Sequence, residues 1–324
     1  MKAVLCTEFG EYNTLTLSDM PEPTAGPGQI VVDVAFASLN FPDLLTIKGQ
    51  YQIKAEPPFV PGFEAAGIVS AVGEGVRTLA VGDRVAAVGV VGAFAEKWLV
   101  DAAACVPIPD GISDEVAACL TVAYGTSYHA LKQRAKLRQG ETLLVLGASG
   151  GVGSAAVEIG ASMGALVIAA ASTDEKLAFC RELGATETVN YKTENLTNRV
   201  KEITGGEGVD VIYDPVGGEL SEQAFRAIGW NGRHLVIGFA AGDIPRVPWN
   251  LPLLKGASIV GVFWGSFTAR EARENQINVH ELLDLVGTGK LGPRVTAEFS
   301  LDDFALAFEM VASREVRGKV VLRI

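Results

Sequence analysis

The sequence has few of the residues that build metal sites and disulfide frameworks. Its four cysteines lie far apart and form no C-x-x-C pair: Cys6, Cys105, Cys119 and Cys180. Only three histidines are present: His129, His234 and His280. No His/Cys cluster has ligand spacing, so the ligand count argues against a protein-built metal site. We therefore expect buried or inert thiols rather than disulfides.

The sequence also lacks a long apolar run. No stretch reaches the roughly 18 apolar residues of a membrane span. Residues 1–5 are followed at once by Glu8 and Glu11, which is not the pattern of a signal peptide, so we expect a cytoplasmic protein. The net charge of −11 argues against nucleic acid and anionic membranes as partners, although one basic pocket could still hold an anionic cofactor.

A chain of 324 residues suggests about two domains. The first 120 residues read as β-rich, because short apolar or alternating runs are separated by proline- and glycine-rich turns. The expected strands cover 1–6, 29–37, 64–72, 84–88 and 95–100. This pattern predicts a compact, barrel-like domain.

From Glu141 onward, apolar strands alternate with helical segments. The expected strands cover 142–146, 165–171, 187–190, 209–213, 234–237 and 258–263, and the expected helices cover 154–163, 174–183, 196–203, 220–228 and 251–255. Six strands joined by five crossovers predict an α/β fold with a doubly wound parallel sheet, a Rossmann domain.

The remaining C-terminal segment gives two helix signals and one strand. The spacing of Thr268 and Glu271 predicts a capping box and a helix to about residue 286, and Ser300 begins another helix to about residue 312. The apolar strand at 319–324 has no place in a complete six-stranded sheet, so we expect it to return to the N-terminal domain. The predicted domains are therefore 1–120 with 290–324, and 121–289.

The most informative segment is the glycine-rich turn after the strand at 142–146. Residues 148–153 fit G-x-G-x-x-G, except that Ala148 replaces the first glycine, which is tolerable where φ stays negative. The turn opens a helix, and helix N-terminal N–H groups bind anions. We expect the pyrophosphate of a dinucleotide to bind at these residues: Ser149, Gly150, Gly151, Val152 and Gly153.

The residues at the end of the second strand of this sheet indicate which dinucleotide cofactor binds. An NAD site usually carries an acidic residue there, but residues 168–173 contain none. Ser172, Lys176 and Tyr191 could instead bind a 2′-phosphate. Asp174 and Glu175 are better explained as first-turn helix charges. We therefore predict NADPH rather than NADH.

Seven segments, taken together, resemble a known family. They are 40–43, 49–51, 61–67, 81–85, 148–153, 214–218 and 318–321, and they extend over nearly the whole chain. Their order and spacing are similar to zinc-free medium-chain dehydrogenases/reductases of the NADPH:quinone oxidoreductase family, relatives of zeta-crystallin. The resemblance implies a GroES-like catalytic domain joined to a Rossmann domain that binds NADPH.

The resemblance also argues against zinc. Zinc alcohol dehydrogenases place Cys where Asn40 stands and His where Phe63 stands, and neither replacement is a useful ligand. Without a metal to polarise an oxygen atom, alcohol oxidation is disfavoured. Reduction of an activated acceptor, a quinone or an α,β-unsaturated carbonyl, fits better.

Catalytic positions implied by the resemblance are Asn40 beside the nicotinamide, Tyr51 in the substrate cleft as a possible hydrogen-bond donor, and Thr126 near the nicotinamide. Each residue also has a purely structural explanation. Asn40 could be a turn residue before Pro42, Tyr51 a loop aromatic, and Thr126 a helix hydroxyl that bonds its own backbone. Proton delivery by water stays open. The resemblance also implies cofactor contacts at Val216, Ile237, Phe239, Phe263, Gly265 and Lys319. Core packing is the alternative for the aromatic residues, and a surface position is the alternative for Lys319.

The acceptor itself is left open by the sequence. Enoyl thioester or haloacrylate reduction, and a non-catalytic NADPH-binding role, are the competing functions. The strand at 258–263 would form an apolar sheet edge, and pairing with a second copy would cover it. The resemblance implies such a homodimer.

Overall fold

The computed structural model describes all 324 residues, which divide into two compact units. Unit 1 comprises Met1–Ala123 and Glu281–Ile324, and unit 2 comprises Tyr124–His280. The boundaries expected from the sequence were 120/121 and 289/290. In both descriptions the second unit is an insertion between two parts of the first.

Unit 1 is built on a seven-stranded sheet with the order β14-β15-β3-β4-β5-β7, in which β6 also pairs with β3. Its strands are β3 (Gln29–Leu39), β4 (Glu64–Val72), β5 (Arg84–Val88), β6 (Lys97–Asp101), β7 (Cys105–Pro107), β14 (Val295–Ser300) and β15 (Lys319–Arg323). A two-stranded sheet joins β1 (Lys2–Leu5) and β2 (Thr16–Asp19). The core includes Phe94, Trp98 and Phe308.

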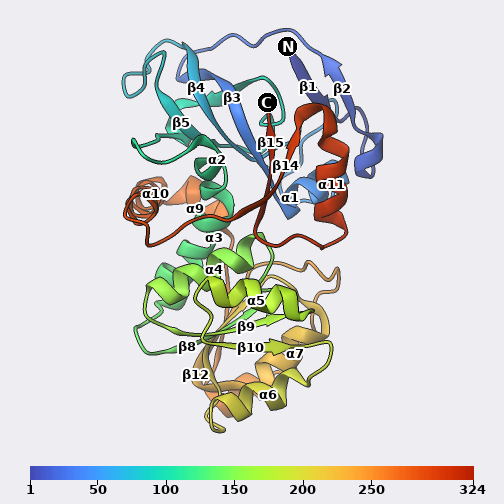
Figure 1. Cartoon of the computed structure of the whole chain (residues 1–324), viewed down its shortest axis with the longest axis vertical. Helices are drawn as coiled ribbons and strands as arrows, with labels where there is room; N and C mark the ends of the chain where they lie inside the picture. Colours follow the sequence, from blue (N-terminus) through green and yellow to red (C-terminus); the bar gives the residue numbers. More distant parts are fainter. The chain divides into compact units, whose positions relative to one another are not determined.

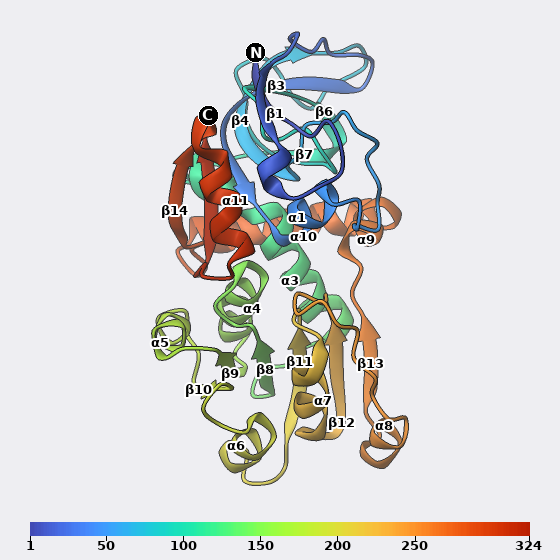
Figure 2. The same cartoon turned by 90° about the vertical axis from the view of Figure 1, so that its right-hand side faces the viewer.

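The C-terminal strand returns to unit 1, as expected. β15 pairs antiparallel with β3, and the red C-terminal segment lies beside the blue N-terminal strands (Figures 1 and 2). The neighbouring strand β14, which runs parallel to β15, was not anticipated. The helices of unit 1 are α1 (Phe41–Ile47), α2 (Asp114–Ala117) and α11 (Phe304–Ala312), while α10 (Ala272–Gly287) spans the boundary. Short 3₁₀ turns cover Tyr12–Thr14, Ala102–Ala104 and Leu301–Asp303.

Unit 2 contains a parallel six-stranded sheet with the order β10-β9-β8-β11-β12-β13, the order of a Rossmann fold. Its strands are β8 (Thr142–Leu146), β9 (Leu166–Ala171), β10 (Glu187–Asn190), β11 (Val209–Asp214), β12 (Ile228–Val236) and β13 (Ser258–Gly261). All six predicted strands are present. β12 begins earlier than predicted, at Ile228, and it includes Asn231 with a left-handed φ of 59°.

The helices of unit 2 are α3 (Gly125–His129), α4 (Gly151–Ser162), α5 (Asp174–Glu182), α6 (Leu196–Ile203), α7 (Gly218–Arg226), α8 (Asn250–Lys255) and α9 (Trp264–Arg270). Wider π-type turns cover Leu120–Tyr124 and Ala130–Ala135. A buried cluster places α6 and α7 on one face of the sheet. No helix of the chain has both the length and the apolar character that a membrane crossing requires.

The predicted capping box at Thr268 is wrong. Thr268 lies inside α9, and its hydroxyl donates to the Gly265 carbonyl at 2.9 Å. The helix starts earlier, at Trp264, and ends before Glu271, after which α10 begins at Ala272. The spacing of Thr268 and Glu271 therefore coincides with a helix end rather than a helix start.

Candidate active site

The glycine-rich turn joins β8 to α4 in unit 2. The left-handed residue is Gly147, with a φ of 56°, whereas Ala148 has no positive φ. Ala148 therefore fits at the position of the first motif glycine without strain. Its N–H donates to the Ala170 carbonyl at 3.1 Å, which ties the turn to β9.

The third motif glycine allows a close approach between helix and turn. A Cβ at Gly153 would overlap the Gly147 carbonyl oxygen, so only glycine fits there. Gly150 is the N-cap of α4 in an extended conformation, and no side chain caps this helix. The first N–H groups of α4 are therefore left for a ligand, and the turn fits a dinucleotide pyrophosphate.

Two predicted cofactor residues follow paired strands of unit 2, and a third lies in the helix α5. Ser172 follows Ala171 at the end of β9, and Tyr191 follows Asn190 at the end of β10, where Ala171 and Asn190 are register partners. Lys176 lies in the first turn of α5, whose N-cap Thr173 accepts the Lys176 N–H at 3.3 Å. The fold thus brings Ser172, Lys176 and Tyr191 to one end of neighbouring strands.

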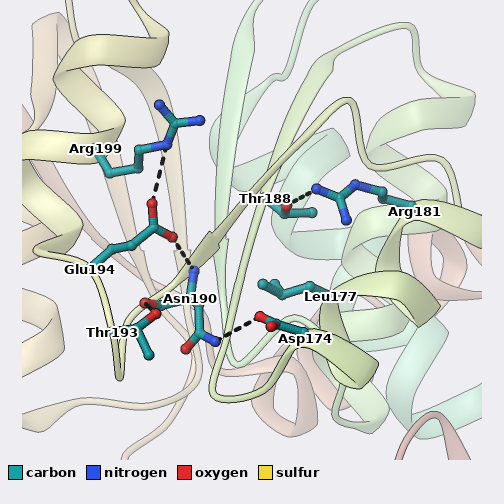
Figure 3. A pocket seen from close by; sticks show the side chains of 8 residues that line it. All are labelled: Asp174, Leu177, Arg181, Thr188, Asn190, Thr193, Glu194 and Arg199. Carbon is teal, nitrogen blue, oxygen red and sulfur yellow. Dashed lines mark hydrogen bonds and ion pairs between the residues drawn. The ribbon is translucent and has the colours of Figure 1, made fainter.

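Asp174, the nearby acid, is engaged elsewhere. Its Oδ1 accepts a hydrogen bond from Asn190 Nδ2 at 2.9 Å, and Figure 3 shows the two side chains pointing at each other in a polar pocket of about 370 Å³. Glu194 accepts the Asn190 N–H on the far side of this pocket. This arrangement supports a structural role for Asp174.

The other predicted contacts of unit 2 lie after β11, β12 and β13. Val216 adjoins the glycine-rich turn, because a Cβ at Gly147 would lie 2.9 Å from a Val216 methyl group. Ile237 donates its N–H to the Asp214 carbonyl at 2.9 Å, and Phe239 follows two residues later. Phe263 is 48% exposed, and Gly265 lies in the first turn of α9.

In unit 1, Asn40 lies at the centre of a buried polar network. Lys319 Nζ donates to Asn40 Oδ1 at 2.6 Å and to Glu64 Oε1 at 3.0 Å. Asn40 Nδ2 donates to Glu64 Oε1 at 2.9 Å and to the Ser38 carbonyl at 3.2 Å. Both hydrogens of the carboxamide are therefore used, and Asn40 has no donor left for an acceptor.

Lys319 is placed differently from what the family resemblance implied. Its side chain is 2% exposed, and its ammonium is also 3.4 Å from the Leu39 carbonyl. The ammonium is thus committed to Asn40, Glu64 and Leu39, and we do not retain it as a cofactor ligand. Its physical role is to balance the buried carboxylate of Glu64.

Sequence reasoning missed two acidic members of this network. Glu64 Oε2 accepts from Thr121 Oγ1 and from the Val122 N–H, both at 2.8 Å. Asp43 accepts the Asn40 N–H at 2.7 Å, and full burial raises its pKa to about 8 although that hydrogen bond and Lys319 lower it. Asp43 is therefore mostly neutral at pH 7. Each acid lies within a segment that resembles the family, but the sequence alone does not show which residue pairs with it.

Tyr51 and Thr126 differ from Asn40 in having uncommitted hydroxyls. Neither hydroxyl hydrogen-bonds within the chain, and both residues are half-buried. Tyr51 packs edge-on against Phe63 with ring centroids 5.2 Å apart. Burial raises the pKa of Tyr51, with a smaller contribution from Asp43, so the phenol is a neutral donor. Phe63 itself has no atom that could bind a metal.

Comparisons with known proteins agree with this architecture. Residues 26–110 match the alcohol dehydrogenase GroES-like domain, and residues 151–284 match the zinc-binding dehydrogenase domain. The chain is 40% identical to quinone oxidoreductase-like protein 2 homolog of Nematostella vectensis, over 99% of this chain and 88% of that protein. It is 33% identical to quinone oxidoreductase of Pseudomonas aeruginosa, over 99% of both.

A solved structure gives the same result. Escherichia coli quinone oxidoreductase, crystallised with NADPH, superposes with a TM-score of 0.93 at 27% identity, over 100% of both chains. The two domains define an alcohol dehydrogenase-like, medium-chain type of oxidoreductase. Within that class, the chain belongs to the quinone oxidoreductase family.

Proposed function

We propose that this NADPH-dependent oxidoreductase reduces quinones or activated α,β-unsaturated carbonyls without a metal. The observation that carries the proposal is the glycine-rich start of α4, where no side chain caps the first N–H groups and a bound pyrophosphate would satisfy them. The side chains at the two zinc-ligand positions support the metal-free part. Phe63 has no donor atom, and Asn40 is saturated by Lys319, Glu64 and Ser38.

The residues present suit NADPH. The α4 N-terminus would hold the pyrophosphate, while Ser172, Lys176 and Tyr191 would hold the 2′-phosphate by hydrogen bonds and one positive charge. We assign Asp174 a first-turn helix role, because it lies in the first turn of α5 and its carboxylate accepts a hydrogen bond from Asn190. We propose Val216, Ile237, Phe239, Phe263 and Gly265 as further contacts at the strand ends.

When bound, NADPH supplies the hydride that reduces the acceptor. We propose that the Tyr51 phenol donates a hydrogen bond to the acceptor oxygen as negative charge develops there. Thr126 offers a second free hydroxyl. Asn40 contributes indirectly, by joining the start of α1 to Glu64 and Lys319. Proton delivery by water is consistent with these roles.

We further propose a homodimer through the β13 edge. Several large apolar side chains on and near β13 and α8 are exposed, including Trp249 at 80% and Leu253 at 79%. β13 pairs only with β12, so its outer edge is open. Pairing with a second copy would cover both the edge and the apolar side chains. Light scattering should give twice the mass of one chain. The substitution Ile259→Lys places a charge on the β13 edge and should lower the measured mass toward that of one chain.

The enzymatic test uses purified protein, NADPH or NADH, and a matched panel of quinones, enones and enoyl thioesters. We expect NADPH oxidation with quinones or enones, a lower rate with NADH, and no loss after chelator treatment. Faster turnover of an enoyl thioester would favour the alternative substrate. Tight NADPH binding without turnover of any acceptor would support a non-catalytic role. The cytoplasmic location stays a prediction, testable by fractionation.

A further inference from the structure

The short helix α3 of unit 2 lies between two wider turns of the chain, Leu120–Tyr124 and Ala130–Ala135. Such wide turns interrupt the regular hydrogen-bond ladder of a helix and occur often at functional sites. In Figures 1 and 2, α3 lies beside α4, the helix that the glycine-rich turn opens. Because the ladder is interrupted at both ends, the side-chain contacts of α3 decide how it is oriented.

The side chain of Ser127 joins α3 to the start of α4. Its Oγ donates to the Val152 carbonyl, in the first turn of α4, at 3.0 Å, and lies 2.8 Å from the phenol oxygen of Tyr213 in β11. Ser127 and Tyr213 are both 0% exposed. Since the Val152 carbonyl can only accept, the single hydroxyl hydrogen of Ser127 is used there, and Tyr213 donates to Ser127. Burial raises the pKa of Tyr213, so the phenol keeps its proton. One buried chain of hydrogen bonds therefore runs from β11 through α3 to the glycine-rich turn.

The residue on the other side of Thr126 is also held. A Cβ at Gly125 would lie 3.0 Å from the Trp264 indole, so this side chain of α9 packs directly against the backbone of α3. Trp264 immediately precedes Gly265, a proposed cofactor contact. Thr126 stands between Gly125 and Ser127, and its hydroxyl has no partner within the chain. The two contacts thus fix the backbone that carries this free hydroxyl relative to the start of α4 and the start of α9.

We propose that Ser127 and Tyr213 are positioning residues, which hold Thr126 in register with the glycine-rich turn and so place the nicotinamide relative to the pyrophosphate. This inference rests on the proposed function, in which α4 holds the pyrophosphate and Thr126 faces the nicotinamide. Both residues are completely buried, so they act through Thr126 rather than by touching the cofactor. The proposed 2′-phosphate site at the ends of β9 and β10 does not include α3. The adenosine end of the cofactor should therefore bind independently of this pair.

Calorimetric titration of the whole chain tests the inference with two ligands, NADPH and adenosine 2′,5′-bisphosphate, which lacks the nicotinamide half. Ser127→Ala removes the whole hydrogen-bond chain, whereas Tyr213→Phe keeps the ring and removes only the phenol hydroxyl. We expect Ser127→Ala to weaken NADPH binding about fivefold and to change bisphosphate binding less than about twofold. Tyr213→Phe should have the same effect in smaller measure. The double variant should lose no more than Ser127→Ala alone, because the two hydroxyls belong to one chain.

Thr197→Val is the matched control for the loss of a hydroxyl that joins two helices. Thr197 Oγ1 donates to the Gln223 carbonyl at 2.7 Å and ties α6 to α7, away from α3. This variant should leave the ratio of the two affinities unchanged. Equal weakening of both ligands by Ser127→Ala would indicate a purely structural role and overturn the inference, as would an unchanged NADPH affinity in both Ser127→Ala and Tyr213→Phe. Absence of turnover with every acceptor would refute the proposed reaction alone, since this comparison measures only binding.

Discussion

Lys319→Met tests whether the buried network of unit 1 depends on its single positive charge. Lys319 and Glu64 form an ion pair at 3.0 Å with side chains 2% and 0% exposed. Removing one partner of such a pair leaves a charge buried without compensation, which costs about 3–5 kcal/mol. A methionine fills much of the space of the lysine, so the lost charge, rather than a cavity, dominates this cost.

Urea unfolding followed by circular dichroism measures the loss. The matched control is Lys97→Met, because Lys97 pairs with Asp33 at 2.8 Å at the surface, and such pairs contribute about 0–1 kcal/mol. The double variant Lys319→Met with Glu64→Gln should recover most of the loss, since a neutral amide needs no counter-charge. A loss below about 1 kcal/mol, or a double variant no more stable than the single one, would refute this reasoning.

Four further predictions follow from the site. Gly153→Ala should weaken NADPH binding at least tenfold by titration, because its methyl group overlaps the turn, while Gly287→Ala, which meets nothing within 4 Å, should not. Ser172→Asp should shift the kcat/KM preference from NADPH toward NADH, because a carboxylate repels the 2′-phosphate; an unchanged ratio contradicts that position. Tyr51→Phe should lower kcat by up to about 10² and leave KM nearly unchanged; equal kcat removes the donor role. Burial raises the pKa of Asp43 from 3.8 to about 8 in the folded protein. Between these two pH values Asp43 is therefore protonated in the folded state and ionised in the unfolded state. Stability should therefore fall as pH rises from about 4 to about 8, and the denaturation midpoint of Asp43→Asn should depend less on pH; identical slopes would count against it.

The parts of the fold that the sequence predicted depend on local patterns. The strands of unit 2 are continuous apolar runs bounded by glycine, and the turn before α4 is a short motif with a backbone requirement of its own. The start of β12 was missed, because the predicted strand began at residue 234 and the strand begins at Ile228. Asn231 has a left-handed φ of 59° within the strand, a conformation more typical of a turn, so a local rule does not identify this part of the strand.

The network around Asn40 could not be predicted from local patterns. Lys319 meets Asn40 across 279 residues and Glu64 across 255 residues, through the pairing of β15 with β3. The sequence showed a lysine at the start of a C-terminal strand, which suits a surface position equally well. Only the register of the two strands brings its ammonium against the buried carboxylate.

That network also changes how the candidate catalytic residues rank. Asn40 was proposed beside the nicotinamide, yet both its amide hydrogens are donated to Glu64 and Ser38. An acceptor that gains negative charge needs a donor that is not already committed. In unit 1 the Tyr51 phenol meets that requirement, because its hydroxyl has no partner within the chain and burial keeps it protonated. Asn40, Glu64 and Lys319 then act by fixing the start of α1, so their loss should be seen first in stability, whereas loss of the Tyr51 hydroxyl should be seen in the rate.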